Sequence, residues 1–253
     1  EEYLRIVSSP SPDISELTLS EPDDYSILAQ EEIPNEINWV AKGKVTPVGN
    51  QGKCNVGWAF SVTGALESEK AIKYEAAPVK LSEQNLIECS GGFGNKRCSG
   101  GNLENTYKYV NHSRGIEKED SYRDNFRHIN SRCQYDSTKS AVSIKNFSRC
   151  QTNEAHLKMQ VVGRPVSVYI NPTLESFKHY KGDIYDDPQC DNSRHESSYA
   201  VLVVGYGTDN NTDYWLIKNS LGTSWGEKGY MRLARNRNNL CGIAHIFYYP
   251  VLG

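Results

Sequence analysis

The sequence predicts an α+β protein built from two lobes. Helical patterns dominate the first part of the chain, alternating strand patterns dominate the second, and Gly, Asn and Asp residues separate the strand segments. Helices followed by strands favour two lobes over a sheet in which the two kinds of element alternate along the chain.

Four helices are predicted before residue 163. The longest covers residues 56–72, where apolar residues recur at helical spacing and Gly64 permits close packing. The other three are shorter, and each follows residues suited to a helix start. The first covers 84–88 and follows Ser82 and Glu83. The second runs through Tyr107 and Val110; Gly101 and Asn102 open it, and Gly115 closes it. The third covers 154–162 and follows Thr152.

Four strands are predicted after residue 164. Apolar and polar residues alternate in the first, and the others are apolar or aromatic runs of strand length between turn residues. The segments are 165–170, 200–207, 213–219 and 230–234.

Length and composition indicate a globular protein. The 253 residues suffice for one large domain or two tightly packed ones, and 38% of them are hydrophobic against 23% charged. The net charge of −3 argues against a nucleic-acid binder, which needs a basic stripe to neutralise phosphates. The longest apolar run, 199–204, is far shorter than the ~20 residues that span a bilayer, so no membrane span is expected.

Cysteines and glycosylation motifs predict a secretory route. The chain has seven cysteines, and three N-x-[ST] triplets begin at Asn111, Asn146 and Asn210. We therefore expect N-linked glycans and a secreted protein, or one of the lysosomal or vacuolar lumen. No signal peptide is seen, so the numbering is expected to begin after processing or at a fragment boundary.

Six sequence blocks occur in an order typical of one protease family. Residues 51–61 read Gln-Gly-Lys-Cys-Asn-Val-Gly-Trp-Ala-Phe-Ser. The others are Cys-Ser-Gly-Gly at 98–101, Ala-Val-Leu-Val-Val-Gly-Tyr-Gly at 200–207, Tyr-Trp-Leu-Ile-Lys-Asn-Ser at 214–220, Trp-Gly at 225–226 with Gly-Tyr at 229–230, and Cys-Gly-Ile-Ala at 241–244.

On these blocks, residues 33–253 resemble the papain-family cysteine peptidases, and within them the cathepsin L group. The resemblance implies a helical left lobe, about 45–143, and a β-rich, barrel-like right lobe, about 144–240 together with 33–44. A peptide cleft is expected between the lobes. No cofactor and no metal is implied.

The resemblance also implies that the catalytic pair is missing. The family motif C-G-[SA]-C-[WY] has its nucleophilic cysteine where Gly57 stands, and its histidine where Tyr199 stands. Glycine cannot attack a carbonyl, and a phenol with a pKa near 10 is a poor base at neutral pH. Gln51 matches the oxyanion-hole donor, and Asn219 matches the asparagine that orients the histidine.

Further cleft positions follow from the same resemblance. Gly100 and Gly101 match the glycine pair that lets a substrate backbone approach, and Trp225 also belongs to the cleft. Leu221 replaces a tryptophan that shields the His–Asn pair. Each substitution also has a structural interpretation: Gly57 as a permissive helix start, Tyr199 as a packing aromatic, and Leu221 as an apolar exchange. Three changes in one catalytic unit favour loss of activity.

The remaining histidines do not replace the missing one. His195 precedes Tyr199 by four residues, which span about 13 Å of extended chain, so it is interpreted as a loop residue. His179 and His245 are interpreted as structural.

The resemblance implies three disulfides, each stabilising the fold by about 2–4 kcal/mol. They join Cys54 to Cys98, Cys89 to Cys133 and Cys190 to Cys241. Cys150 is left over. It is either an inert, buried thiol or one that forms an intermolecular bridge or is capped as a reactive thiol.

Residues 1–32, called here the N-terminal segment, differ from the rest. They contain no cysteine or glycine, and 8–13 is turn-prone. They are either a loosely packed tail or a retained propeptide, because 1–5 resemble the end of the last propeptide helix of cathepsin L-like zymogens. A propeptide would place part of 8–28 between the lobes, near Gly57, Gly100 and Tyr199.

Two functions remain open at this point. The first is a non-catalytic papain fold, a pseudoprotease that binds its own N-terminal segment and a peptide or protein ligand, or serves a structural or storage role. The alternative is a cysteine-type endopeptidase homologue with residual or altered hydrolase activity, using Cys150 or Tyr199.

Overall fold

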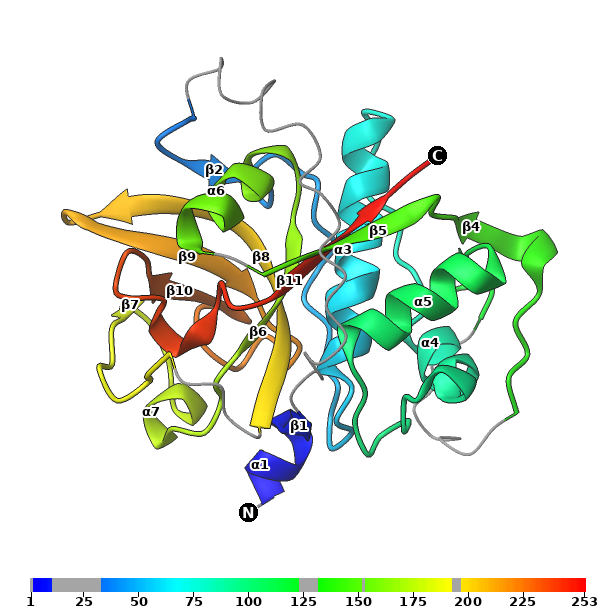
Figure 1. The fold of residues 1–253 in the computed structure, drawn as a ribbon, viewed down its shortest axis with the longest axis horizontal. Helices are drawn as coiled ribbons and strands as arrows, with labels where there is room; N and C mark the ends of the chain where they lie inside the picture. The colour runs from blue at the N-terminus through cyan, green and yellow to red at the C-terminus, as the bar shows by residue number, and fades with distance from the viewer. Residues whose placement is uncertain (1, 11–32, 123–131, 152, 193–196) are drawn as a thin grey trace.

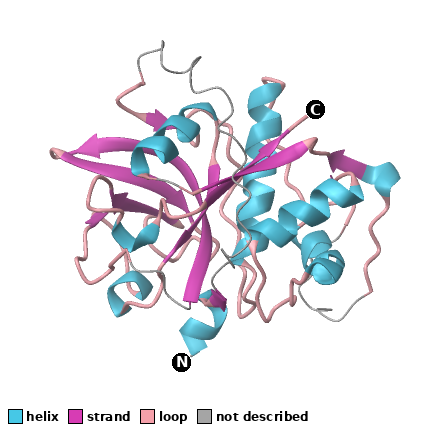
Figure 2. Ribbon diagram, in the orientation of Figure 1, coloured by secondary structure: helices cyan, strands magenta, loops and turns pink. Residues whose placement is uncertain are grey.

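The computed structural model describes residues 2–10, 33–122, 132–151, 153–192 and 197–253. Within these ranges a helical lobe and a β-rich lobe lie on either side of the long helix α3 (Gly57–Lys73), as Figure 1 shows. Figure 2 shows most strands on one side, and α3, α4 and α5 together on the other. The predicted α+β, two-lobed fold is confirmed.

The helical lobe contains the predicted short helices with their predicted caps. Ser82 accepts a hydrogen bond from the backbone N–H of Asn85, and Asn102 accepts one from Asn105, so each side chain caps the helix that follows it. The elements are α3, α4 (Glu83–Cys89), η1 (Ser90–Phe93), α5 (Leu103–Ser113), β3 (Ile116–Glu117), η2 (Ser137–Lys139) and β4 (Ser140–Val142).

Helix α3 is buried on most of its surface because it packs between the two lobes. The Ser61 hydroxyl donates a hydrogen bond of 2.8 Å to the carbonyl of Val201 in the sheet. A Cβ atom on Gly64 would lie 2.8 Å from a methyl carbon of Leu202. Gly64 therefore allows α3 and the sheet to pack closely, since a larger residue would require the Leu202 side chain to move.

The β-rich lobe is one sheet in the order β5-β11-β6-β8-β9-β10-β7, with β1 and β2 also paired to β8. The pairings are antiparallel except for β7 with β10. The strands are β1 (Ser9–Pro10), β2 (Ile37–Asn38), β5 (Asn146–Cys150), β6 (Val166–Ile170), β7 (Ile184–Tyr185), β8 (Ser197–Asp209), β9 (Thr212–Lys218), β10 (Tyr230–Ala234) and β11 (Phe247–Val251).

Helices α6 (Glu154–Gly163) and α7 (Glu175–Lys178) and the turn η3 (Leu240–Gly242) complete this lobe. The predicted cap of α6 was wrong: Asn153, not Thr152, accepts the hydrogen bond from the N–H of His156. Asparagine one residue later satisfies the same orphan N–H group, and Thr152 lies outside the described residues.

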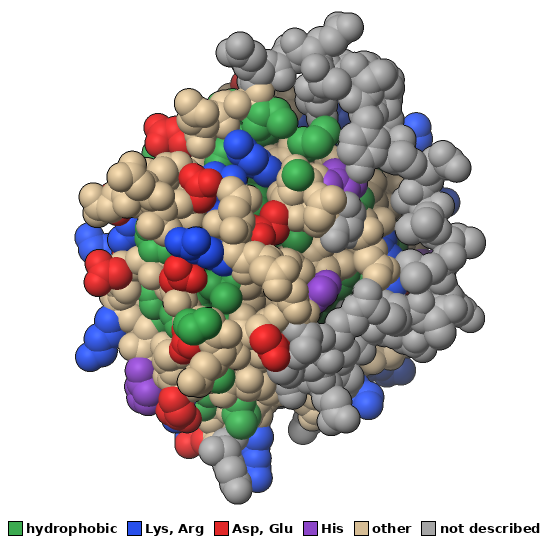
Figure 3. Space-filling model, turned by 60° about the vertical axis from the view of Figure 1, so that its left-hand side comes forward, with side chains coloured by type: hydrophobic (Ala, Val, Ile, Leu, Met, Phe, Trp, Pro, Cys, Tyr) green, Lys and Arg blue, Asp and Glu red, His purple; other side chains and the backbone are tan. Residues whose placement is uncertain are grey.

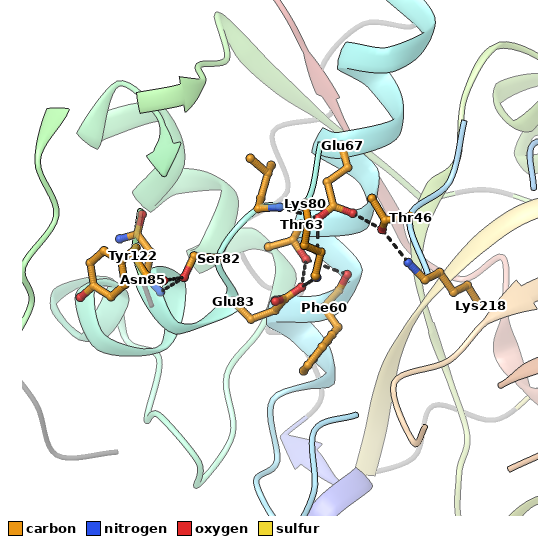
Figure 4. A network of polar contacts seen from close by, with 11 residues as sticks. Thr46, Phe60, Thr63, Glu67, Lys80, Ser82, Glu83, Asn85, Tyr122 and Lys218 are labelled. Atoms are coloured by element: carbon orange, nitrogen blue, oxygen red, sulfur yellow. Dashed lines mark hydrogen bonds and ion pairs between the residues drawn. The ribbon is translucent and has the colours of Figure 1, made fainter. Parts of the chain in front are cut away.

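A network of buried charges joins the lobes, as Figure 4 shows. The ammonium group of Lys218, on β9, donates to the Thr46 hydroxyl at 3.0 Å, and that hydroxyl donates to the carboxylate of Glu67 on α3. Lys80 lies between Glu67, at 3.6 Å, and Glu83 of α4. Burial lowers the pKa of Lys218 and raises that of Glu83. The network therefore holds buried groups from both lobes in hydrogen-bonded pairs.

The outer surface carries charges of both signs. Figure 3 shows acidic and basic side chains interspersed on the face that it draws. In the part of the chain that the structure describes, no helix is both long enough and apolar enough to span a bilayer.

Candidate functional site

The site begins at the first residue of α3. Gly57 is buried, and Val56 before it offers the helix no side-chain cap. A Cβ atom built on Gly57 would lie 2.6 Å from Cε2 of the Tyr199 ring and 3.0 Å from the carbonyl oxygen of Ala200. Real Cβ atoms essentially never approach another heavy atom within 3.0 Å, so the ring of Tyr199 fills the space that any side chain at position 57 would need.

Tyr199 lies on β8 and is 1% exposed. Its hydroxyl is 2.9 Å from Oε1 of Gln51, from Oδ1 of Asn219 and from Oγ of Ser220. The phenol has one hydrogen, so it donates to one of the two amide oxygens at a time. Burial raises the pKa of Tyr199 well above its ordinary value, and the phenol stays neutral at physiological pH.

Gln51 has both of its amide hydrogens in use. Its Nε2 donates to the carbonyl of Cys54 at 2.9 Å and to the carbonyl of Ile6 at 2.6 Å. Its Oε1 accepts a hydrogen bond of 2.6 Å from the hydroxyl of Ser220. The side chain is therefore held at both ends.

Asn219 follows β9 and is also buried. Its Oδ1 accepts from the Tyr199 hydroxyl and from the backbone N–H of Ser220. Its Nδ2 has no hydrogen-bond partner among the described residues. The structure thus brings Gln51, Gly57, Tyr199 and Asn219 together. It adds Ser220, which the sequence analysis did not single out.

The described part of the N-terminal segment lies against this group. Helix α1 (Glu2–Val7) and strand β1 meet the end of β8 at the junction of the lobes, as Figure 1 shows. Val7 is fully buried, and β1 pairs with Ser197 and Ser198 of β8. Asn55 donates to the carbonyl of Ser8. Of the residues expected in the cleft, 8–10 lie here, and 11–28 fall outside the described residues.

Aromatic and apolar side chains of the β-rich lobe flank α1. Tyr3 and Ile6 pack against the same core cluster as Leu221 and Trp225. The ammonium group of Lys178 is 5.6 Å from the centre of the Tyr3 ring. Leu221 and Trp225 therefore pack on the same core cluster as the apolar residues of α1.

The wall formed by Gly100 and Gly101 is tied to the sheet. A Cβ atom on Gly101 would lie 2.7 Å from the Trp58 ring. Two residues later, the N–H of Leu103, the first residue of α5, donates to the hydroxyl of Tyr169 on β6 at 2.7 Å. The Tyr169 side chain is 5% exposed and belongs to the hydrophobic cluster of the helical lobe. It therefore joins the two lobes directly beside the glycine pair.

Comparison with known proteins assigns the family. The model described as papain family cysteine protease matches residues 33–251. The chain belongs to the papain family of cysteine proteases. This papain-family chain is 41% identical over 238 residues to a cathepsin L-like peptidase of Aedes aegypti, covering 92% of this chain and 68% of that one.

Two further matches agree with that assignment. The chain is 42% identical over 223 residues to cathepsin L of Sarcophaga peregrina, covering 87% of this chain and 64% of that one. It superposes on the solved structure of digestive procathepsin L 3 from the larval midgut of Tenebrio molitor with a TM-score of 0.85 and 34% identity. That match covers 99% of this chain and 78% of the other.

The three histidines considered as replacements either have other partners or lie outside the described residues. His179 pairs with Glu175 at 3.2 Å on α7, and His245 contacts the carbonyl of Asn192. His195 is not among the described residues. No cluster that could hold a metal ion occurs in the described ranges.

The cysteines pair as the resemblance implies, Cys54 with Cys98, Cys89 with Cys133 and Cys190 with Cys241. Cys150 forms no disulfide and is half-buried at the end of β5. The three asparagines of the glycosylation motifs, Asn111, Asn146 and Asn210, are all exposed and could therefore accept a glycan.

Proposed function

We propose that this papain-family chain is a pseudoprotease whose cleft is closed by its own N-terminal segment. The contact between Gly57 and Tyr199 carries the proposal. A protease of this family needs a thiolate at position 57 and an imidazole at position 199. Here a buried aromatic ring occupies the volume that the thiol would fill.

The groups that remain cannot supply the missing chemistry. The Tyr199 phenol is neutral at physiological pH, and its hydroxyl already contacts Gln51, Asn219 and Ser220. A neutral phenol is a weak base and a weak nucleophile. Removing the nucleophile or the base of a catalytic triad costs on the order of 10⁶ in kcat, and this chain lacks both.

The oxyanion-hole position supports the same conclusion. An oxyanion hole stabilises a tetrahedral intermediate only if its donors are free to meet the developing charge. Both hydrogens of Gln51 are engaged, one of them by the Ile6 carbonyl. A peptide entering from outside would have to displace the N-terminal segment first.

We infer that residues 1–32 are a retained propeptide and that 33–253 form the papain-like domain. The segment is covalently attached, so its effective concentration at the cleft is high, on the order of millimolar for a short linker. Weak contacts then suffice to keep it bound. Cleavage near 29–32 by another protease would release it and open the cleft to a peptide or protein ligand.

The disulfides and the exposed glycosylation motifs support a secretory route, ending outside the cell or in a lysosomal or vacuolar lumen. In that setting the protein acts as a peptide-binding, structural or storage component. Calorimetry with a peptide library, before and after cleavage near 29–32, separates these roles. Heat of binding that appears only after cleavage supports peptide binding, and none in either state supports a structural or storage role.

The test of inactivity is a fluorogenic dipeptidyl assay on the purified chain, with an active cathepsin L as positive control. We expect no turnover that an epoxide inhibitor of cysteine peptidases can block. Inhibitor-sensitive turnover that co-purifies with the protein would overturn the proposal. Mass spectrometry of the inhibitor-treated sample then shows whether the inhibitor has alkylated this chain or a contaminating protease.

A further inference from the structure

The carbonyl end of α1 is bound by two side-chain amides of the loop before α3. The last carbonyl groups of a helix have no partner within the helix. In α1 the Leu4 carbonyl accepts from the N–H of Ser8 at 2.9 Å. The Ile6 carbonyl accepts from Nε2 of Gln51, and the Ser8 carbonyl accepts from Nδ2 of Asn55.

The contacts of the Gln51 amide oxygen set the direction in which its Nε2 donates. Oxygen and nitrogen of a carboxamide lie in one plane, so fixing the oxygen fixes where the N–H groups point. Oε1 of Gln51 lies 2.6 Å from the Ser220 hydroxyl and 2.9 Å from the Tyr199 hydroxyl. Both hydroxyl groups are buried, so no water competes for the amide oxygen.

Apolar contacts and strand pairing complete the docking surface. The apolar residues Tyr3, Ile6 and Val7 lie on α1 with the spacing of one helix face and pack on the core cluster of the β-rich lobe. The chain then extends as β1 along β8. The surface thus fits a short helix that presents apolar residues at positions i, i+3 and i+4 and continues as a strand.

We propose that the altered catalytic site is a receptor for the carbonyl end of a short helix, with Tyr199 as the positioning residue for Gln51. The occupant is the chain's own segment 2–10. The Tyr199 hydroxyl, placed where the family has its imidazole, holds the Gln51 amide toward the Ile6 carbonyl. This inference rests on the proposed function, because a working peptidase would need the same amide free.

The test compares the full chain with Tyr199→Phe and Gln51→Glu by amide hydrogen exchange of residues 2–10. Phenylalanine keeps the ring beside Gly57 and removes only the hydroxyl. Glutamate keeps the shape of Gln51 and removes both donors. Each variant is expected to speed exchange in 2–10 about tenfold, the loss of one or two buried hydrogen bonds, while exchange in α3 stays unchanged.

Tyr107→Phe is the matched control. Tyr107 is fully buried on α5, and its hydroxyl contacts Ser167 rather than the N-terminal segment. Exchange in 2–10 should not change in this variant. Ser220→Ala removes the other hydroxyl at Oε1 of Gln51 and measures the share of Ser220 in holding the amide. If Tyr199→Phe fails to fold, Gln51→Glu alone tests the receptor.

Three outcomes would overturn the inference. One is unchanged exchange in 2–10 in either Gln51→Glu or Tyr199→Phe. The second is release by the hydroxyl deletion without release by Gln51→Glu, which would show that Tyr199 does not act through Gln51. The third is equal release in the Tyr107→Phe control. None of them depends on turnover, so the proposed lack of peptidase activity is tested separately.

Discussion

The first turn of α3 and the turns around Glu67 differ in the side chains that they bury. The first turn buries a glycine against a tyrosine ring, and the turns around Glu67 bury charged groups. At Gly57, the proposed position of the family's nucleophile, no side chain is present and a tyrosine ring fills the space. At Glu67, about three turns later, charged side chains stay buried between the lobes. A pocket lined by residues of both regions, among them Asn219 and Glu83, connects them. Catalysis and the joining of the lobes are therefore separable tasks of one helix.

The contrast has a physical basis. Replacing a catalytic side chain removes a reaction and need not cost stability if the space is refilled. Removing one member of a buried charge network leaves its partners unpaired in a medium that solvates them poorly. Four predictions follow from this difference.

The largest effect is expected from Glu67→Gln. This change would leave Lys80 and Lys218 without a carboxylate that both depend on, and we expect a loss of about 3–5 kcal/mol in the free energy of unfolding. Urea unfolding measures it. The control is Glu175→Gln, which alters an ion pair with Lys178 on α7 at a largely exposed carboxylate and should cost less than about 1 kcal/mol. Equal losses of unfolding free energy in the two variants would show that the buried charge network contributes no more than a surface ion pair.

A second effect is expected from Gly57→Cys. The new Cβ would meet the Tyr199 ring, so we expect a loss of about 1–3 kcal/mol and no peptidase activity. Gly57→Ala should cost a similar amount, because the Cβ rather than the sulfur causes the clash.

Adding Tyr199→His to Gly57→Cys should relieve part of that loss. A double-mutant cycle by urea unfolding gives the coupling between the two positions. Activity, if it returns at all, is expected only in the double variant. The packing argument is wrong if the two substitutions prove additive.

A smaller effect concerns alkaline pH. The folded protein keeps the Tyr199 proton above pH 10, whereas the unfolded chain releases it there. The folded state then binds more protons, so the free energy of unfolding falls as the pH rises above about 10. Tyr199→Phe lacks this group and should lose about 1 kcal/mol less between pH 10 and pH 11, because the unfolded tyrosine is half ionised at pH 10 and almost fully ionised at pH 11.

Guanidinium unfolding at pH 9.5, 10 and 11 measures the difference. The lowered pKa of Lys218 acts in the opposite direction as the pH approaches 10, because the unfolded chain then binds the extra proton, but this contribution is the same in both proteins. If the unsubstituted protein and Tyr199→Phe lose the same unfolding free energy between pH 10 and pH 11, Tyr199 ionises as easily in the folded protein as in the unfolded chain.

The smallest effect is expected at the surface. Glu2 and Lys53 form an ion pair of 2.8 Å between α1 and the loop before α3, with both side chains largely exposed. Lys53→Ala should leave the unfolding midpoint and the exchange of residues 2–10 unchanged, because water and salt screen this pair. Release of residues 2–10 in this variant would show that the ion pair, and not the Gln51 amide, holds the segment in place.

Much of the fold follows from local patterns in the sequence. The spacing of apolar residues predicted α3, and Ser82 and Asn102 predicted the starts of α4 and α5, because a cap depends on neighbours a few residues away. Strand β11 was not predicted, since its run Phe-Tyr-Tyr-Pro-Val lacks alternation and contains a proline.

The contacts within the site were harder to predict from the sequence. The motif blocks revealed that Gly57 and Tyr199 depart from the family, yet the contact between them depends on how β8 packs on α3. The hydrogen bond from Gln51 to the Ile6 carbonyl joins residues far apart in the chain, and no local pattern marks it. Ser220 had one available signal, its place directly after Asn219 in a block that was already recognised.

The fit of the Tyr199 ring against Gly57 also bears on how such a protein can change over time. With the ring in place, a return of cysteine at position 57 meets a steric barrier and gains no base. A return of histidine at position 199 gains no nucleophile and gives up the three contacts of the phenol hydroxyl. Neither substitution alone would therefore restore a catalytic pair that selection could favour. On the proposed function, the packing of the Tyr199 ring on Gly57 therefore makes a stepwise return to catalysis unfavourable.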